Sequence, residues 1–281
     1  MGQEASARLN EPTHISPRVS GSGAVVALVL VEWAAGLLGA AAWTQSWGVI
    51  KAGHFRIVAW SALLLVALAF VAQRAERQQI VSGLVAVLAL ACVVYLVAQR
   101  ASGRVAPTVA GIGGAVLGAA ALSVGATEVS GWPPALAAVE LLGGAVLLGA
   151  VTNGMLLGHW YLNQPGLQPW ALGRLTDLAL VAVAASVGLG AVGAGRLMRA
   201  STAGAGFGLP GLGDAFAKPF FWIWVALVVF TGVVVFLARK CVQIRSIQSA
   251  TGLLYVALLT AGVSEFLVRY LMLNLQTYIP V

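Results

Sequence analysis

Long apolar segments separated by short polar ones make up most of this sequence. A helix needs about 20 mainly apolar residues to cross a lipid bilayer, and charged clusters mark where such helices end. The predicted spans are Gly23–Trp43, Phe55–Ala72, Ile80–Ala98, Val105–Gly125, Pro134–Leu157, Leu172–Gly195, Pro219–Leu237 and Ala250–Leu273. The pattern predicts an all-α integral membrane protein with eight transmembrane helices.

The polar segments predict how these helices are connected. Residues 73–79 and 99–104 are short and charged, as in tight turns, whereas residues 196–218 are long and glycine-rich, as in an external loop. Residues 1–22 are polar, and no small-residue cleavage pattern follows them, so we expect a retained tail and not a signal peptide. The chain is thus divided into a tail, residues 1–22, and an eight-helix transmembrane domain, residues 23–281.

Composition supports lipid as the solvent. Hydrophobic residues make up 60% of the 281 positions and charged residues only 9%, compared with roughly 25% charged residues in soluble domains. This excludes a soluble enzyme and, despite the net charge of +7, a nucleic-acid binder. The 34 glycines suit closely packed transmembrane helices. Two cysteines are too few for a disulfide scaffold or a cysteine-ligated metal site.

The basic residues give a preference for orientation. Eight spans place both termini on one side of the membrane, and the bases divide almost evenly between the two sides. Short loops count most in the positive-inside rule, and the short loops opposite the termini contain Arg100, Arg104, Arg239, Lys240 and Arg245. We therefore expect the inner membrane of a cell, with the termini on the outer, periplasmic side.

Two pairs of residues have a similar spacing. Glu32 precedes His54 by 22 positions, and Glu140 precedes His159 by 19. Each glutamate lies inside a predicted span, and each histidine follows at the membrane side opposite the termini. The likeness predicts two four-helix halves, although two short matches in a sequence of low complexity also arise by coincidence.

Ionisable residues within the spans are candidates for function, because burying a charge in lipid is costly. They are Glu32, Glu140, Arg174, Asp177, Glu265 and Arg269. Glu265 and Arg269 are four residues apart and Arg174 and Asp177 three apart, so each pair shares a helix face. Either these are neutralised pairs that hold helices together, or they form a proton path or a polar ligand site.

Glu32 and Glu140 have no partner at helical spacing. They are expected either to be protonated and hydrogen-bonded or to pair across helices. A proton relay requires buried carboxyl groups that keep and exchange protons. We therefore predict proton transfer through Glu32, Glu140 and Glu265, with Arg269.

The densest polar and aromatic stretch is residues 152–165. An interfacial aromatic belt accounts for its Trp and Tyr residues but less well for His159, which follows Gly158. A quinone head group needs hydrogen-bond donors, an apolar slot and a proton source at the membrane edge. The residues that meet these needs, and that we predict to bind a quinone or quinol, are His159, Tyr161, Arg174 and Asp177.

Other cofactors are less favoured by the sequence. A b-type haem would have to use His54 and His159, which lie at helix ends instead of within helices. Covalent haem is excluded because the chain contains no Cys-x-x-Cys-His motif. No glycine-rich phosphate loop followed by lysine is present, which argues against an ATP site. We predict no metal site.

The last predicted helix resembles a known family. Residues 262–270, Gly-Val-Ser-Glu-Phe-Leu-Val-Arg-Tyr, resemble the closing helix of membrane-anchor subunits of the polysulfide-reductase and DMSO-reductase type. The first helix, with Glu32-Trp33, is similar in outline, and the span count agrees. The resemblance implies a haem-free anchor that exchanges electrons and protons between quinone and an iron–sulfur partner, with both termini outside. Val263-Ser264, between Gly262 and Glu265, depart from that family's pattern.

These observations favour a membrane-anchor subunit of a respiratory-type electron-transfer complex. It would bind quinone or quinol, conduct protons and depend on lipid and on an iron–sulfur or cytochrome subunit. As an enzyme it would be at most the quinone-binding part of an oxidoreductase. The alternatives are a non-catalytic structural subunit of a larger membrane complex and a proton-coupled secondary transporter.

Overall fold

The computed structural model describes residues 22–74, 79–101, 103–129, 131–164, 166–203 and 219–274, and within these ranges the fold is helical. The helices are α1 (Ser22–Ser46), α2 (Ala52–Arg74), α3 (Gln79–Ala98), α4 (Val105–Ala126), α5 (Pro134–Trp160), α6 (Trp170–Ala203), α8 (Pro219–Gln243) and α9 (Ile247–Asn274). The all-α prediction is confirmed for the described residues.

Seven of the described helices are long and apolar enough to cross a membrane. The exception is α3, whose described apolar part, Gly83–Ala98, is shorter than the others. The length and apolar composition of these helices therefore indicate a multi-pass membrane protein. The predicted helix bounds were too short at several ends: α6 continues eight residues beyond Gly195 to Ala203, so the connection expected to begin at Arg196 begins in a helix. The rest of that connection and the polar tail, apart from Ser22, lie outside the described residues.

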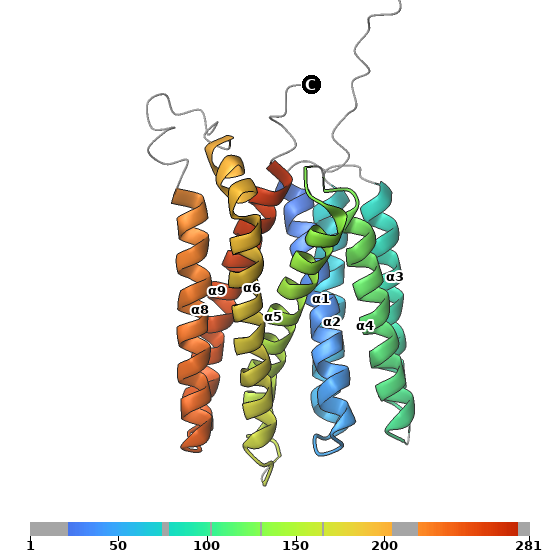
Figure 1. Ribbon diagram of the computed structural model, residues 1–281. Coiled ribbons are helices and arrows are strands. Elements are labelled where there is room, and N and C mark those ends of the chain that lie inside the picture. The colour runs from blue at the N-terminus through green and yellow to red at the C-terminus, as the bar shows by residue number, and fades with distance from the viewer. Residues whose placement is uncertain are drawn as a thin grey trace, which may run out of the picture.

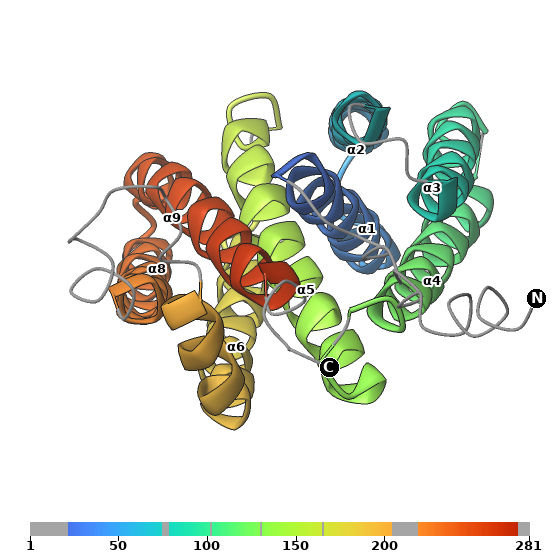
Figure 2. The same ribbon diagram turned by 90° about the horizontal axis from the view of Figure 1, so that it is seen from above.

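The helices run side by side in a bundle, with α1 and α5 at its centre (Figures 1 and 2). In Figure 2, α2, α3 and α4 lie on one side of this pair, and α6, α8 and α9 lie on the other. The helix α1 begins and α9 ends at the upper end of the bundle in Figure 1, which we call the terminal face. The lower end, where α5 ends and α6 begins, is the opposite face.

Glycine allows α1 and α5 to pack with their backbones in contact. A Cβ atom added at Gly36 would overlap the carbonyl group of Ala145, and one added at Gly149 would overlap the backbone of Gly36. Small residues are typical of such close crossings in membranes, where packing replaces the hydrophobic effect between helices. Most residues of α1 and α5 are buried, so this crossing is the core of the bundle.

The outer surface of the bundle is apolar. Large aliphatic and aromatic side chains are exposed on the peripheral helices, including Trp60 and Leu64 on α2, Val109 and Val116 on α4, and Leu259 on α9. A water-soluble protein seldom exposes apolar area of this extent. The same surface is stable against lipid chains, which agrees with the membrane class predicted from composition.

Candidate functional site

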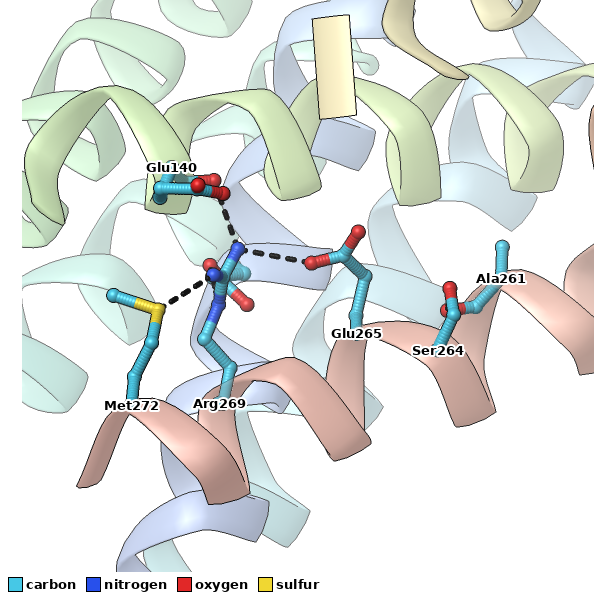
Figure 3. A network of polar contacts seen from close by, with 7 residues as sticks. Glu140, Ala261, Ser264, Glu265, Arg269 and Met272 are labelled. Carbon is cyan, nitrogen blue, oxygen red and sulfur yellow. Dashed lines mark hydrogen bonds and ion pairs between the residues drawn. The ribbon is translucent and has the colours of Figure 1, made fainter. Parts of the chain in front are cut away.

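A fully buried arginine lies near the terminal face of the bundle and contacts three helices. Arg269 of α9 donates from Nε to Glu32 Oε1 of α1 at 2.8 Å, and from Nη2 to Glu265 Oε2 at 2.9 Å and to the backbone carbonyl of Glu140 of α5 at 2.8 Å. Its Nη1 lies 3.1 Å from Met272 Sδ. Figure 3 shows the guanidinium between Glu265 and Glu140. We call Arg269, Glu32, Glu140 and Glu265 the Arg269 cluster.

The Arg269 cluster holds one cation and three carboxyl groups away from water. The relative exposures of Glu32, Glu140 and Glu265 are 0%, 4% and 2%. Glu32 Oε2 and Glu140 Oε1 are buried without a hydrogen-bond partner among the described residues. Gly144 of α5 leaves the space for the ion pair, because a Cβ there would collide with the Glu265 carboxyl group and with Arg269.

Two expectations about these residues are confirmed. The pair at i and i+4, Glu265 and Arg269, forms the buried ion pair that its spacing predicts. Glu32, which has no partner on its own helix, pairs across helices with Arg269. Glu140 differs, since its backbone carbonyl and not its carboxyl group accepts from Arg269. Whether these groups transfer protons stays a prediction.

The other local pair predicted from spacing is wrong. Asp177 of α6 pairs with Arg239 of α8, whose Nη2 lies 3.1 Å from Asp177 Oδ2, and not with Arg174. The guanidinium of Arg174 lies instead against two indole rings, 4.6 Å from the centroid of Trp170 and 5.6 Å from that of Trp47. Helical spacing places Arg174 and Asp177 on one face, but it does not decide which neighbours their side chains contact.

The ion pair between Asp177 and Arg239 is expected to contribute little to stability. Their side chains are 51% and 28% exposed, and exposed ion pairs typically contribute less than about 1 kcal/mol. Asp177→Asn should therefore change the free energy of unfolding in detergent by less than about 1 kcal/mol. A loss well above that value would mean that this pair is a main link between α6 and α8.

His159 lies in the last turn of α5 and faces α9. Its Nε2 is 3.1 Å from the hydroxyl group of Tyr255, and the two rings meet edge to face with centroids 5.4 Å apart. Both side chains are exposed. Gly158, expected to make room for a ligand, makes room for α9, because a Cβ there would collide with Thr251.

Tyr161 is turned toward the connection that follows it. Its hydroxyl group donates to the Gln168 carbonyl at 2.8 Å and accepts from the backbone N–H of Leu172 at 3.4 Å. Burial raises the pKa of Tyr161 to about 12, and the hydrogen bond from Leu172 opposes this rise only in part. The phenol therefore keeps its proton and helps to hold the start of α6.

The four residues predicted to bind quinone thus do not form one site. His159 faces α9, Tyr161 holds the α5–α6 connection, and Asp177 faces α8. Arg174 lies against Trp47, which follows α1. They share the opposite face of the bundle but have different neighbours.

His54 and His159 also have separate neighbours. His54 of α2 is fully buried, and its Nε2 is 3.0 Å from Asn153 Oδ1 of α5; Asn153 in turn donates to Thr44 Oγ1 of α1 at 3.2 Å. His159 is engaged with Tyr255. A haem that used both imidazoles would need both of these contacts to break, so the described geometry does not favour a haem.

An apolar groove of about 420 Å³ lies between α1 and α9. Its lining includes Trp33, Tyr255, Gly262 and Phe266. The indole N–H of Trp33 points inward and donates to Thr152 Oγ1 of α5 at 2.6 Å. Tyr255 therefore joins this apolar groove to His159, which its hydroxyl group contacts.

Sequence reasoning missed Tyr255 and Trp47, and it gave no role to Asn153 within the stretch of residues 152–165. Each stands near an apolar run, where a single aromatic or amide residue is ordinarily packed or interfacial. Their partners are 96, 127 and 99 positions away in the chain, counted to His159, Arg174 and His54. No local spacing could have connected them.

The described residues contain no group of three or more His, Cys, Asp or Glu side chains placed to hold a metal ion. Comparisons of the chain with protein-family models, with curated proteins and with solved structures found no match. What this protein does must therefore be inferred from its own side chains and their geometry.

Proposed function

We propose that this chain is an eight-span inner-membrane subunit of an electron-transfer complex, in which it binds quinol and carries protons. The observation that carries the proposal is the position of the α1–α9 groove. Tyr255, one of its lining residues, contacts His159, and the groove runs beside the buried Arg269 cluster, to which both α1 and α9 contribute residues.

The Arg269 cluster supports the proton part. One guanidinium balances one carboxylate, and uncompensated charge in a membrane interior is costly. Two of the three carboxyl groups, from Glu32, Glu140 and Glu265, are then best held as neutral, protonated acids. Such groups can accept and release protons, which is what carrying protons away from a bound quinol requires.

The groove supports the quinone part. Trp33 and Phe266 line it, while their chain neighbours Glu32 and Glu265 are buried in the Arg269 cluster. An isoprenoid chain fits an apolar groove, and a quinone oxygen needs a hydrogen-bond partner such as Tyr255 or His159. Since Tyr161, Arg174 and Asp177 are held elsewhere, we place the head group at His159 and Tyr255 alone. Protons released there would pass toward Glu265 and Glu32.

The remaining parts of the proposal concern assembly. A chain that supplies protons and a quinol site needs another subunit to take the electrons, and we propose an iron–sulfur or cytochrome partner, as in the polysulfide-reductase type of anchor. We place the termini on the periplasmic side and treat α1–α4 and α5–α9 as two four-helix halves. The position of α1 and α5 at the centre, with three helices on either side, supports this division.

The test begins with the complex isolated from native membranes. We expect redox subunits to co-purify and the complex to oxidise quinol. His159→Ala and Tyr255→Phe should each lower the rate of quinol oxidation by about 100-fold or more, the low end of what one proton-transfer group contributes. Trp60→Phe, on the lipid-facing surface of α2, is the control and should retain the wild-type rate.

Three outcomes would overturn the proposal. Isolation without redox partners would favour a proton-coupled transporter. Partners without any redox centre would favour a structural subunit. A wild-type rate of quinol oxidation in His159→Ala and Tyr255→Phe would show that quinol does not bind at these two residues.

A further inference from the structure

A second feature of the opposite face involves two arginines that flank the turn after α1. Arg174 of α6 lies against the indole rings of Trp47 and Trp170, which also contact each other. Gly48 follows Trp47 in the chain, and Arg104, which directly precedes α4, lies against it. A Cβ atom added at Gly48 would overlap the guanidinium of Arg104. Gly48 has a positive φ of 69°, a conformation that favours glycine. Arg104 and Arg174, which are far apart in the chain, thus contact adjacent residues of one turn.

Neither arginine has an acidic partner among the described residues. The guanidinium of Arg174 contacts two indole rings, and the nearby Asp177 is paired with Arg239. Both arginine side chains are exposed. This leaves a site with two positive charges and no counter-charge at the edge of the membrane.

Above these charges lies an apolar groove of about 340 Å³ between α1, α4 and α5. Its lining is made mostly of small residues, among them Gly36, Gly39, Ala115 and Ala145. The close crossing of α1 and α5 removes side-chain volume here, and α4 also contributes alanines. The result is a groove lined by small side chains and not a flat helix surface.

Two tryptophans connect the groove to the turn that the two arginines contact. Trp43 lines the groove, and its ring meets that of Trp47 at a centroid distance of 4.8 Å. Leu178 also lines the groove and lies one helical turn after Arg174 on the same face of α6. A molecule in the groove would therefore end at Trp43 and Trp47, next to the positive charge of Arg174.

We propose that this site binds one anionic phospholipid, with its phosphate group between Arg104 and Arg174 and an acyl chain in the groove. Guanidinium groups match phosphate oxygens in geometry and charge, and basic pockets between transmembrane helices are typical sites for anionic head groups. Tryptophans at the head-group level fit the same depth. A neutral quinone head would leave both charges uncompensated. The site is separate from the α1–α9 groove and does not depend on the proposed function.

The test uses the full-length chain purified in detergent and titrated with dioleoyl phosphatidylglycerol or dioleoyl phosphatidylcholine, with bound lipid counted by native mass spectrometry. Each arginine near an anionic lipid contributes about 1 kcal/mol, which is about fivefold in affinity. We expect Arg104→Gln with Arg174→Gln to weaken phosphatidylglycerol binding by about 30-fold. Phosphatidylcholine binding should change little.

Two matched variants serve as controls. Arg100→Gln removes an exposed charge from the same α3–α4 connection and should retain wild-type affinity for phosphatidylglycerol. Ala115→Phe fills the groove and should abolish tight binding of either lipid, whereas Val116→Phe, on the exposed surface of α4, should not.

Several results would overturn the proposal. Equal affinities of the wild-type chain for the two lipids would show that the site does not select an anionic head group. An equal effect of Arg100→Gln and Arg104→Gln would show that binding depends on net charge and not on a specific contact. Unchanged binding in Ala115→Phe would show that the groove does not hold the acyl chain.

Discussion

Arg269→Gln is expected to destabilise the protein by about 3–5 kcal/mol, because it leaves the carboxyl groups of a buried ion pair without their partner. Arg269 forms buried ion pairs with Glu32 and Glu265 and also binds the carbonyl of Glu140. Its loss removes contacts that join α1, α5 and α9. The measurement is the free energy of unfolding in detergent, obtained by denaturant titration.

A double variant separates the loss of charge balance from the loss of packing. Adding Glu32→Gln to Arg269→Gln removes one of the buried carboxyl groups that lose their partner, and we expect it to recover at least about 1 kcal/mol, within the range of coupling between contacting residues. Arg100→Gln, at an exposed turn, should stay within about 0.5 kcal/mol of wild type. Wild-type stability in Arg269→Gln, or no recovery in the double variant, would contradict an electrostatic role for the Arg269 cluster.

Gly36→Val is expected to prevent α1 and α5 from packing as they do. The added Cβ would overlap the Ala145 carbonyl group, and a backbone atom cannot rotate away as a side chain can. Overpacking in a close-packed core costs about 1–3 kcal/mol and occasionally more, and this crossing lies at the top of that range. We expect a loss of about 3 kcal/mol or more, measured as unfolding in detergent and as the yield of monodisperse protein.

Gly188→Ala provides the control for this prediction. Gly188 lies within α6, and nothing surrounds the position of an added Cβ. The substitution should leave stability unchanged or raise it by up to about 1 kcal/mol, the difference in helix propensity between the two residues. If Gly36→Val were as stable as Gly188→Ala, α1 and α5 would not be in backbone contact.

Helix positions were largely predictable from the sequence. Runs of apolar residues of bilayer length predict helices whatever their neighbours, because a backbone in lipid must satisfy its own hydrogen bonds. The ends were less predictable. Residues such as Arg196 and Arg199 in α6 continue a helix beyond the apolar run, since a charged residue at the membrane edge is compatible with either a helix or a loop.

Pairing of the candidate site residues was predictable only in part. Glu265 and Arg269 pair as their spacing predicts, because both face the same buried neighbours. Arg174 and Asp177 have an equally suitable spacing, yet exposure at the membrane edge lets Arg239 reach Asp177 and lets Arg174 contact Trp47. Spacing within a helix therefore predicts an ion pair only where both side chains are buried and have few other possible partners.

Lipid as the solvent, the helical class and the set of chemically reactive residues follow from the sequence alone, because each depends on local composition and on the cost of placing backbone and charge in lipid. The packing of the helices then selects which of these residues contact one another. Arg269 and Glu32 come from different helices, as do His159 and Tyr255, and Arg104 precedes α4 whereas Gly48 lies in the turn after α1. Lipid favours helices without favouring one neighbour over another, so contacts such as the Gly36–Gly149 crossing select the neighbours and thereby the sites.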